Sequence, residues 1–274
     1  MSVVTVLAPM LAHALDGRGE GVRLDCTWTQ HFPDSASHLS FGDSITGASY
    51  WWGGAVHFAG IQWSSNYSTR PDLITMPLPG VSGEAVVPSS LDLYVDDVLR
   101  YSSSVPSGPF QIEGIPVVTG EGQVNVVVND PLGRQQVITV PYYASPELLR
   151  AGLQDFSFEA GVTRENYGLA SDDYGPPLIA GTDRVGLSNQ LTVEVHGEAM
   201  PEQQTLGFSA AYLLGQFMVL NSSVAGSHAA EGDGELFVLG LDHTARKLSF
   251  GASAQYATST LMSLGILPGQ PGAR

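Results

Sequence analysis

Long stretches of alternating apolar and polar residues limit most strongly how this chain can fold. A period of two places unlike side chains on opposite faces of a β-strand. The clearest stretches are residues 22–28, 155–160, 191–196, 205–212 and 248–255. They approach the ~10 residues that a tilted strand needs to cross a bilayer, whereas strands of soluble β-sandwiches usually have ~5–6. With Leu, Phe and Tyr on one face and small polar residues on the other, the pattern predicts an apolar surface against lipid and a wet interior. The alternation alone equally fits a soluble β-sandwich.

The composition supports an all-β chain and excludes one class of function. With 32 Gly and 17 Pro among 274 residues, the sequence has too many turn formers for a helical bundle. The formal net charge is −16, and Lys247 is the only lysine. A nucleic-acid binder holds phosphates with clustered Lys and Arg. Because this sequence lacks such clusters, we expect no nucleic-acid partner.

We expect neither a metal nor a cofactor. Cys26 is the only cysteine, and the seven histidines show no H-x-H or H-x-x-x-H spacing. Neither the acidic pair Asp96–Asp97 nor residues 231–235 fulfil the D-x-D-x-D-G pattern with a later bidentate Glu that a calcium loop needs, so we interpret both as solvated turns. The glycines of residues 108–122 open no helix after a strand, which indicates turns and not a phosphate cradle.

Residues 80–146 differ from the rest of the chain in the length and composition of their apolar segments. Short Val-rich segments, at 91–95, 124–128 and 136–140, replace the longer alternating ones. Residues 129–133 (NDPLG) form a turn signal between the last two, since Pro presets φ and Gly tolerates positive φ. The pattern predicts a small β-sandwich inserted between two runs of longer strands. The expected domains are 1–79 (an N-terminal segment and barrel strands), 80–146 (the inserted sandwich) and 147–274 (further barrel strands).

Four pieces of the sequence occur in a distinctive order. FGDSITG (41–47) and VHFAGIQWSSN (56–66) are followed by residues 93–128, which contain VPSGPF, and by residues 135–161, which contain VPYYASPELLR. This series resembles the outer-membrane usher family of chaperone–usher pilus assembly. In that family a strand carrying G-D-S precedes a β-sandwich plug with V-P-x-G-P-F and V-P-Y signatures. The matching residues are Gly42, Asp43, Ser44, Pro106, Gly108, Pro109, Phe110, Pro141 and Tyr142.

The resemblance implies an all-β fold, a partial transmembrane β-barrel with an inserted β-sandwich plug. It also implies a pore in the outer membrane of a Gram-negative bacterium, in contact with outer-membrane lipid, that passes pilus subunits delivered by a periplasmic chaperone. No catalytic residue is implied. The plug is expected to block the lumen at rest and to swing out about two linkers, at residues 77–83 and 144–149, which contain Pro79, Gly80, Ser145 and Pro146.

Ushers of this family are much longer, and roughly ten long strands would hardly close around a plug, so we expect a fragment of a longer protein. The Pro/Gly-rich residues 265–274 are expected to be a turn between hairpins. Residues 1–14 end in an A-x-A-like site but lack a basic start, which favours ordinary mature sequence over a signal peptide.

Two other functions fit parts of the sequence. A soluble secreted β-sandwich, such as an adhesin, would explain the alternation and the acidity. A GDS-type serine esterase would use Ser44, but no histidine follows an aspartate by three residues as that chemistry requires. We therefore interpret Ser44 as a turn residue. The aromatic residues around one hairpin predict a girdle at a bilayer interface; they are Tyr50, Trp51, Trp52, Trp63 and Tyr67.

Overall fold

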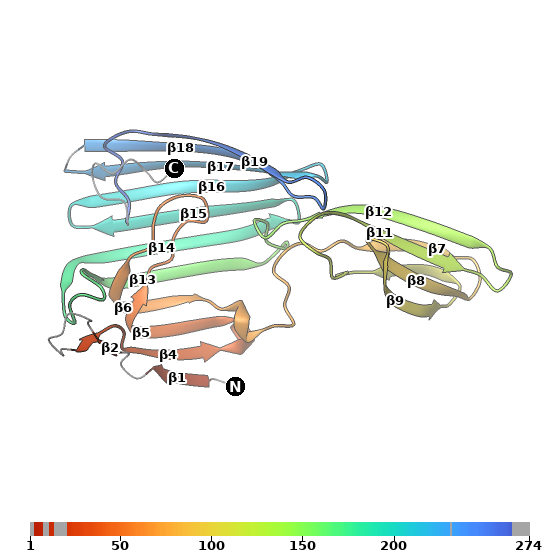
Figure 1. The fold of residues 1–274 in the computed structure, drawn as a ribbon, viewed down its shortest axis with the longest axis horizontal. Coiled ribbons are helices and arrows are strands. Elements are labelled where there is room, and N and C mark those ends of the chain that lie inside the picture. Colours follow the sequence, from red (N-terminus) through yellow and green to blue (C-terminus); the bar gives the residue numbers. More distant parts are fainter. Residues whose placement is uncertain (1–2, 8–10, 14–20, 231, 265–274) are drawn as a thin grey trace.

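The computed structural model describes residues 3–7, 11–13, 21–230 and 232–264 (Figure 1). Its regular structure is almost entirely β, with two short 3₁₀ turns, η1 (Pro33–Ser35) and η2 (Tyr67–Thr69). In the described part of the chain, no helix has the length and hydrophobicity that crossing a membrane requires. The expected turn at 265–274 and, within residues 1–14, residues 1–2, 8–10 and 14 lie outside the described residues.

The largest element is an antiparallel sheet whose strands lie side by side in Figure 1. In spatial order it contains β1 (Val3–Leu7), β4 (Thr27–Phe32), β5 (Ser37–Ile45), β6 (His57–Ser65), β13 (Gln154–Arg164), β14 (Tyr174–Ser188), β15 (Leu191–Met200), β16 (Gln203–Leu214), β17 (Met218–Ala229), β18 (Gly232–His243) and β19 (Phe250–Ala257). Within the described residues β1 and β19 are its two edges, so the sheet is open. A separate two-stranded ribbon joins β2 (Leu11–His13) and β3 (Gly21–Arg23).

Most of the predicted strands are confirmed. The alternating stretches at 155–160, 191–196 and 205–212 lie within β13, β15 and β16. The stretch at 248–255 is displaced by two residues, since β19 begins at Phe250. The single strand predicted at 22–28 is wrong: β3 ends at Arg23 and β4 begins at Thr27. The break exists because the Asp43 carboxylate accepts a hydrogen bond from the backbone N–H of Cys26 (2.8 Å), which draws the chain out of the ladder.

The two faces of the long sheet are inverted relative to a soluble protein. On β15 the side chains of Thr192, Glu194 and His196 are buried, while Val195 is exposed. On β16 the buried positions are Thr205, Gly207, Ser209 and Ala211, and the exposed ones include Leu206, Phe208 and Tyr212. We call these the polar face and the apolar face. An apolar face open to the surroundings is typical of a strand that meets lipid.

The inserted domain, which we call the plug, enters the chain between β6 and β13, although these two strands are hydrogen-bonded neighbours. Its strands are β7 (Val81–Ala85), β8 (Ser89–Val95), β9 (Val98–Val105), β10 (Gly108–Ile112), β11 (Gly120–Asn129) and β12 (Gln135–Ala144). One sheet has the order β12-β11-β8-β9, and β10 and β7 form the other. The predicted turn before β12 is confirmed, with Gly133 at φ +80° and its N–H bonded to the Asp130 carbonyl.

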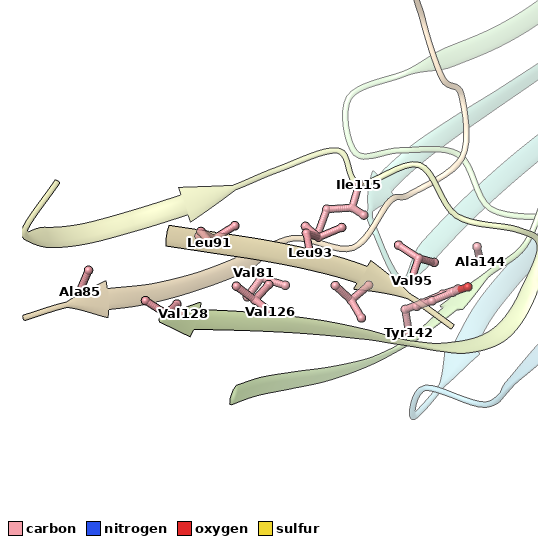
Figure 2. Packing of buried hydrophobic residues seen from close by; sticks show 11 residues of the cluster. Val81, Ala85, Leu91, Leu93, Val95, Ile115, Val126, Val128, Tyr142 and Ala144 are labelled. Atoms are coloured by element: carbon pink, nitrogen blue, oxygen red, sulfur yellow. The ribbon is translucent and has the colours of Figure 1, made fainter. Parts of the chain in front are cut away.

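The plug has a hydrophobic core of its own. Figure 2 shows its side chains pointing into the space between the strands, from Val81 and Ala85 on β7 to Leu91 and Leu93 on β8 and Val126 and Val128 on β11. Strand alternation produces this core, since every second residue is buried along β8 and, from Val124 onward, along β11. In Figure 1 the plug lies beyond the ends of the long strands, on the side where β6 ends and β13 begins.

Candidate functional site: the polar face and its junction with the plug

The loop between β5 and β6, residues 46–56, covers part of the polar face. Glu194 of β15 accepts hydrogen bonds from the Ser49 hydroxyl and from the Tyr50 N–H, whose nitrogen lies 3.2 and 3.3 Å from the two carboxylate oxygens. Glu159 of β13 accepts one from the Gly47 N–H at 2.8 Å. Buried carboxylates need such donors, because an unpaired charge away from water is costly. These two carboxylates therefore hold the loop against the sheet.

Trp52 anchors the centre of this loop. Its indole N–H donates to the Ser209 hydroxyl at 3.2 Å, and its ring meets the His196 ring edge-on, with 5.0 Å between centroids. Directly beneath it is Gly207, where a Cβ atom would lie 2.1 Å from the indole ring. A glycine is thus required at position 207 for the loop to lie this close to β16.

Residues 258–264, after β19, cover a second part of the polar face. Glu198 accepts hydrogen bonds from the Ser263 hydroxyl (3.0 Å) and the Leu264 N–H (2.6 Å). Its carboxylate also lies 2.8 Å from Nε2 of His196. The Met262 N–H donates to the Ser227 hydroxyl at 3.0 Å. The polar face is therefore buried because two chain segments pair with its carboxylates and hydroxyls.

Arg184 of β14 connects the β5–β6 loop to the chain segment that leaves the plug. Its guanidinium donates to the carbonyls of Glu147 and, at 3.4 Å, Pro146. Its Cζ atom also lies 4.3 Å from the centroid of the Tyr50 ring and 5.3 Å from that of Trp51. Nearby, the N–H of Leu149 donates to the Thr192 hydroxyl at 2.8 Å. A movement of the chain segment that leaves the plug would therefore change the contacts of Arg184 with the β5–β6 loop.

The predicted linker residues lie where the plug joins the sheet. The Pro79 carbonyl accepts a hydrogen bond from Ile115, and Gly80 directly precedes β7. The Ser145 carbonyl accepts one from the Leu148 N–H at 3.2 Å, which forms a turn beside Pro146. The chain segments just outside the two linkers are joined as well, because the Arg150 N–H donates to the Thr75 carbonyl at 2.7 Å. Burial raises the pKa of the Glu147 carboxyl, with the nearby Asp242 as the second cause.

The G-D-S residues form a polar cluster at the opposite ends of the strands. Gly42 has φ +116°, and a Cβ there would lie 2.1 Å from the Cys26 carbonyl oxygen. The Asp43 carboxylate, almost fully buried, lies 2.7 Å from Arg23 and 3.3 Å from Arg164. Ser44 donates to the Gln62 side chain at 2.7 Å. The G-D-S motif therefore has a structural role, since its contacts join β3, β5 and β13.

The remaining signature residues lie in the plug, far from that cluster. Pro106 precedes β10, which begins with Gly108, Pro109 and Phe110, and Phe110 packs against the plug core. Pro141 opposes Gln123 across the β11–β12 ladder. The Tyr142 hydroxyl donates to the Asp96 carboxylate at 2.9 Å. Burial, followed by this hydrogen bond and the Asp96 charge, raises the pKa of Tyr142 to about 12.

The structure corrects the predicted aromatic girdle. Tyr50, Trp51 and Trp52 do not lie on the apolar face, because the loop that carries them is folded over the polar face. Trp63 is half exposed on the apolar face beside Phe156 and Phe158, as predicted. Tyr67 lies in η2 and donates to the Gln154 carbonyl. The acidic pair interpreted as a solvated turn is partly structural, since Asp96 also accepts the Gln123 N–H. The turn predicted at 231–235 is wrong for its described part, since residues 232–235 begin β18, and Glu231 lies outside the described residues.

Sequence reasoning did not single out Arg184, Glu159, Glu194 or Glu198. The available signal was a charged residue at a small-residue position of an alternating strand, which marks a polar partner on that face. The contacts themselves join residues more than 30 positions apart.

A sequence model of the family described as "Outer membrane usher protein" matches residues 18–253. Among curated relatives, the F1 capsule-anchoring protein of Yersinia pestis is 27% identical over 190 residues, which are 69% of this chain and 22% of that protein. The outer membrane usher protein FocD of Escherichia coli is 31% identical over 157 residues, 57% of this chain and 17% of FocD. The chain thus spans about a fifth of the length of these relatives.

Two solved structures have a similar fold. One, a cryo-EM structure of the E. coli P pilus tip assembly intermediate PapC-PapD-PapK-PapG, is matched with a TM-score of 0.61 and 18% identity over 95% of this chain and 33% of that one. The other, the translocation pore of the P pilus usher PapC, gives a TM-score of 0.50 and 22% identity over 89% of this chain and 50% of that one. The expected all-β fold, a partial transmembrane β-barrel with an inserted plug, is confirmed. The chain belongs to the outer membrane usher family.

Proposed function

We propose that this protein forms part of the wall and the plug of an outer-membrane pore, through which pilus subunits delivered by a periplasmic chaperone pass. The observation that carries the proposal is a folded β-sandwich inserted between two strands, β6 and β13, that are direct neighbours in the sheet. Such an insertion tethers a compact body at the mouth of a barrel by two adjacent chain segments. The family membership and the inverted faces of the sheet support the same function.

The proposed motion is a rotation of the plug about the linkers at 77–83 and 144–149. Domain hinges are a few terminal residues that absorb the backbone change. The second linker is held to the sheet by hydrogen bonds of its backbone groups with Arg184 and Thr192 and by the Leu148 side chain, which is buried against the sheet. Contacts of this kind can be exchanged without unpacking the plug core, which is separate from them.

We also propose that the protein catalyses no reaction. Its work would be to bind and pass folded subunits. In support, Ser44 donates its hydroxyl hydrogen bond to Gln62, and a nucleophilic serine needs a general base at that position.

The test is to replace residues 81–144 by a short Gly/Ser linker in the natural protein, expressed in cells that lack other copies of it. The cells should become sensitive to bulky antibiotics and should stop displaying pili. Equal amounts of heat-modifiable protein in the outer membrane serve as the control for folding. Unchanged antibiotic sensitivity at equal protein level would contradict a gating role for the plug.

A further inference from the structure

The plug touches the long sheet at a place distinct from its linkers, the turn between β18 and β19. Glu121 of β11 pairs with Ala245 of this turn in a parallel β-bridge. The Glu121 N–H donates to the Thr244 carbonyl at 2.7 Å. Figure 1 shows the plug on this side of the molecule, beyond the ends of the long strands. The contact thus connects the base of the plug to the rim of the sheet.

Tyr143, at the end of β12, completes this contact from the other side. Its hydroxyl accepts a hydrogen bond from the Thr244 N–H at 3.0 Å and donates one to the Asp242 carbonyl at 3.3 Å. Its ring lies nearly parallel to that of His243, with 6.3 Å between centroids. The Tyr143 side chain is buried in a cluster with Leu148, Ala211, Leu213 and Val219. The Tyr143 hydroxyl therefore binds the backbone of the β18–β19 turn, while its ring packs against the apolar cluster.

Gly120 makes the close approach possible. It has φ +105°, and a Cβ atom there would lie 2.7 Å from the Thr244 carbonyl oxygen. Gly108, in the same domain, has a similar φ of +122°, but a Cβ there would meet nothing within 4 Å. Both glycines have a positive φ, which an alanine would adopt only with strain. Of the two, only Gly120 lies against another part of the chain, namely Thr244. The surface of the plug is shaped to fit this turn.

We propose that the β18–β19 turn is a docking site for the plug, which holds the plug beyond the strand ends and so keeps it out of the pore. This inference rests on the proposed gating function. Main-chain pairing with an exposed edge is a general way to bind a β-structure, and side chains such as Tyr143 add to it. The plug has two positions under this proposal, one in the pore and one docked at the turn. A contact that forms only in the docked position raises the fraction of molecules in that position.

The first experiment is a disulfide between the bridged positions, Glu121→Cys with Ala245→Cys, in the natural protein carrying Cys26→Ser. Bridged strand residues have the Cα separation that a disulfide requires. A disulfide should form in outer membranes and should raise the sensitivity of the cells to bulky antibiotics, and a reductant should restore the starting sensitivity. As the matched control, Val127→Cys with Val137→Cys links two partners within the plug sheet and should not change permeability.

The second experiment compares Gly120→Ala with Gly108→Ala in the same double-cysteine background. Gly120→Ala should lower the yield of the disulfide severalfold, because its Cβ collides with the Thr244 carbonyl. Gly108→Ala should leave the yield unchanged, which controls for strain in the plug itself. Equal yields in the two variants would overturn the proposed docking contact.

The outcomes separate this inference from the proposed function. If removing the plug raises permeability but the disulfide does not, the docked plug still closes the pore and the inference is wrong. If the disulfide fails to form in a normally folded protein, the turn is not a docking site. If removing the plug has no effect either, the gating function itself fails.

Discussion

Arg184 and Glu194 lie directly opposite each other on β14 and β15, and each binds a different piece of the chain. Glu194 holds the β5–β6 loop through Ser49 and Tyr50, whereas Arg184 holds the second plug linker through the carbonyls of Pro146 and Glu147. The Tyr50 ring lies against the Arg184 guanidinium and closes the set. One pair of neighbouring charges therefore joins the loop on the polar face to the hinge of the plug.

Removing the Glu194 carboxylate should release the β5–β6 loop. Glu194→Ala leaves the Ser49 hydroxyl and the Tyr50 N–H without their acceptor, at a cost of about 1–3 kcal/mol, or about a 5- to 150-fold rise in opening. Hydrogen exchange of a peptide that covers residues 46–56 measures this in the purified protein. The control is Glu202→Ala in the exposed β15–β16 turn. Equal exchange in both variants would show that the carboxylate does not hold the loop.

Arg184→Gln should loosen the second linker. The two linker carbonyls lose a charged donor, and such bonds contribute about 1.5–3 kcal/mol. The readout is hydrogen exchange of the buried Leu149 amide, which donates a hydrogen bond to the Thr192 hydroxyl and should exchange faster in the variant. Arg184→Lys keeps the charge but not the planar fork, so it should restore protection only in part. Arg134→Gln, at an exposed ion pair of the plug, should leave Leu149 protected; equal exchange of Leu149 in Arg184→Gln and Arg134→Gln would contradict this role of Arg184.

Asp43→Asn should destabilise the barrel strands more than Ser44→Ala. Asp43 is the carboxylate between Arg23 and the buried Arg164, and breaking a buried ion pair costs about 3–5 kcal/mol. Ser44→Ala removes one hydrogen bond to Gln62, worth about 1 kcal/mol. The temperature at which the folded gel band converts to the unfolded one should fall clearly in Asp43→Asn and little in Ser44→Ala. The reverse order would refute the structural part assigned to Asp43.

Tyr142 should ionise well above an ordinary tyrosine. Its folded pKa of about 12 lies above the ordinary tyrosine pKa of 10.0, so its hydrogen bond to Asp96 stabilises the plug fully below pH 10. That stability is lost as the pH rises through 12. The difference in tyrosinate absorbance between the wild type and Tyr142→Phe should therefore show a late transition near pH 12. A transition near pH 10 would mean that the hydroxyl is neither buried nor bonded to Asp96.

The sequence was sufficient for the local features of the fold and insufficient for the long-range ones. Alternation in 191–196 and 205–212 predicts both the strands and the division between a Leu/Phe face and a small polar face, because the pattern is set by neighbours in the chain. The inserted sandwich is predictable for the same reason, from short Val-rich segments and a Pro-Gly turn.

The errors have one physical origin, which is contact between distant residues. The three aromatic residues of the loop, Tyr50, Trp51 and Trp52, carry the composition of a membrane girdle, but Glu194 and Arg184, more than 130 positions later, draw them onto the polar face. Likewise, the strand predicted at 22–28 is interrupted because Asp43 binds the backbone at Cys26. Strand pairing and register, which bring such residues together, are not encoded in local pattern.

The most direct test of the account concerns the two faces of β16. A nitroxide label would be placed at each position from 205 to 212 in turn, in the Cys26→Ser protein in its membrane, and collisions with oxygen and with a water-soluble nickel complex would be measured. Lipid-facing positions favour oxygen, so we predict oxygen maxima and nickel minima at positions 206, 208, 210 and 212, as for a strand in the wall of a membrane pore. Higher access of the nickel complex than of oxygen at those same four positions would place the apolar face in water and contradict the account.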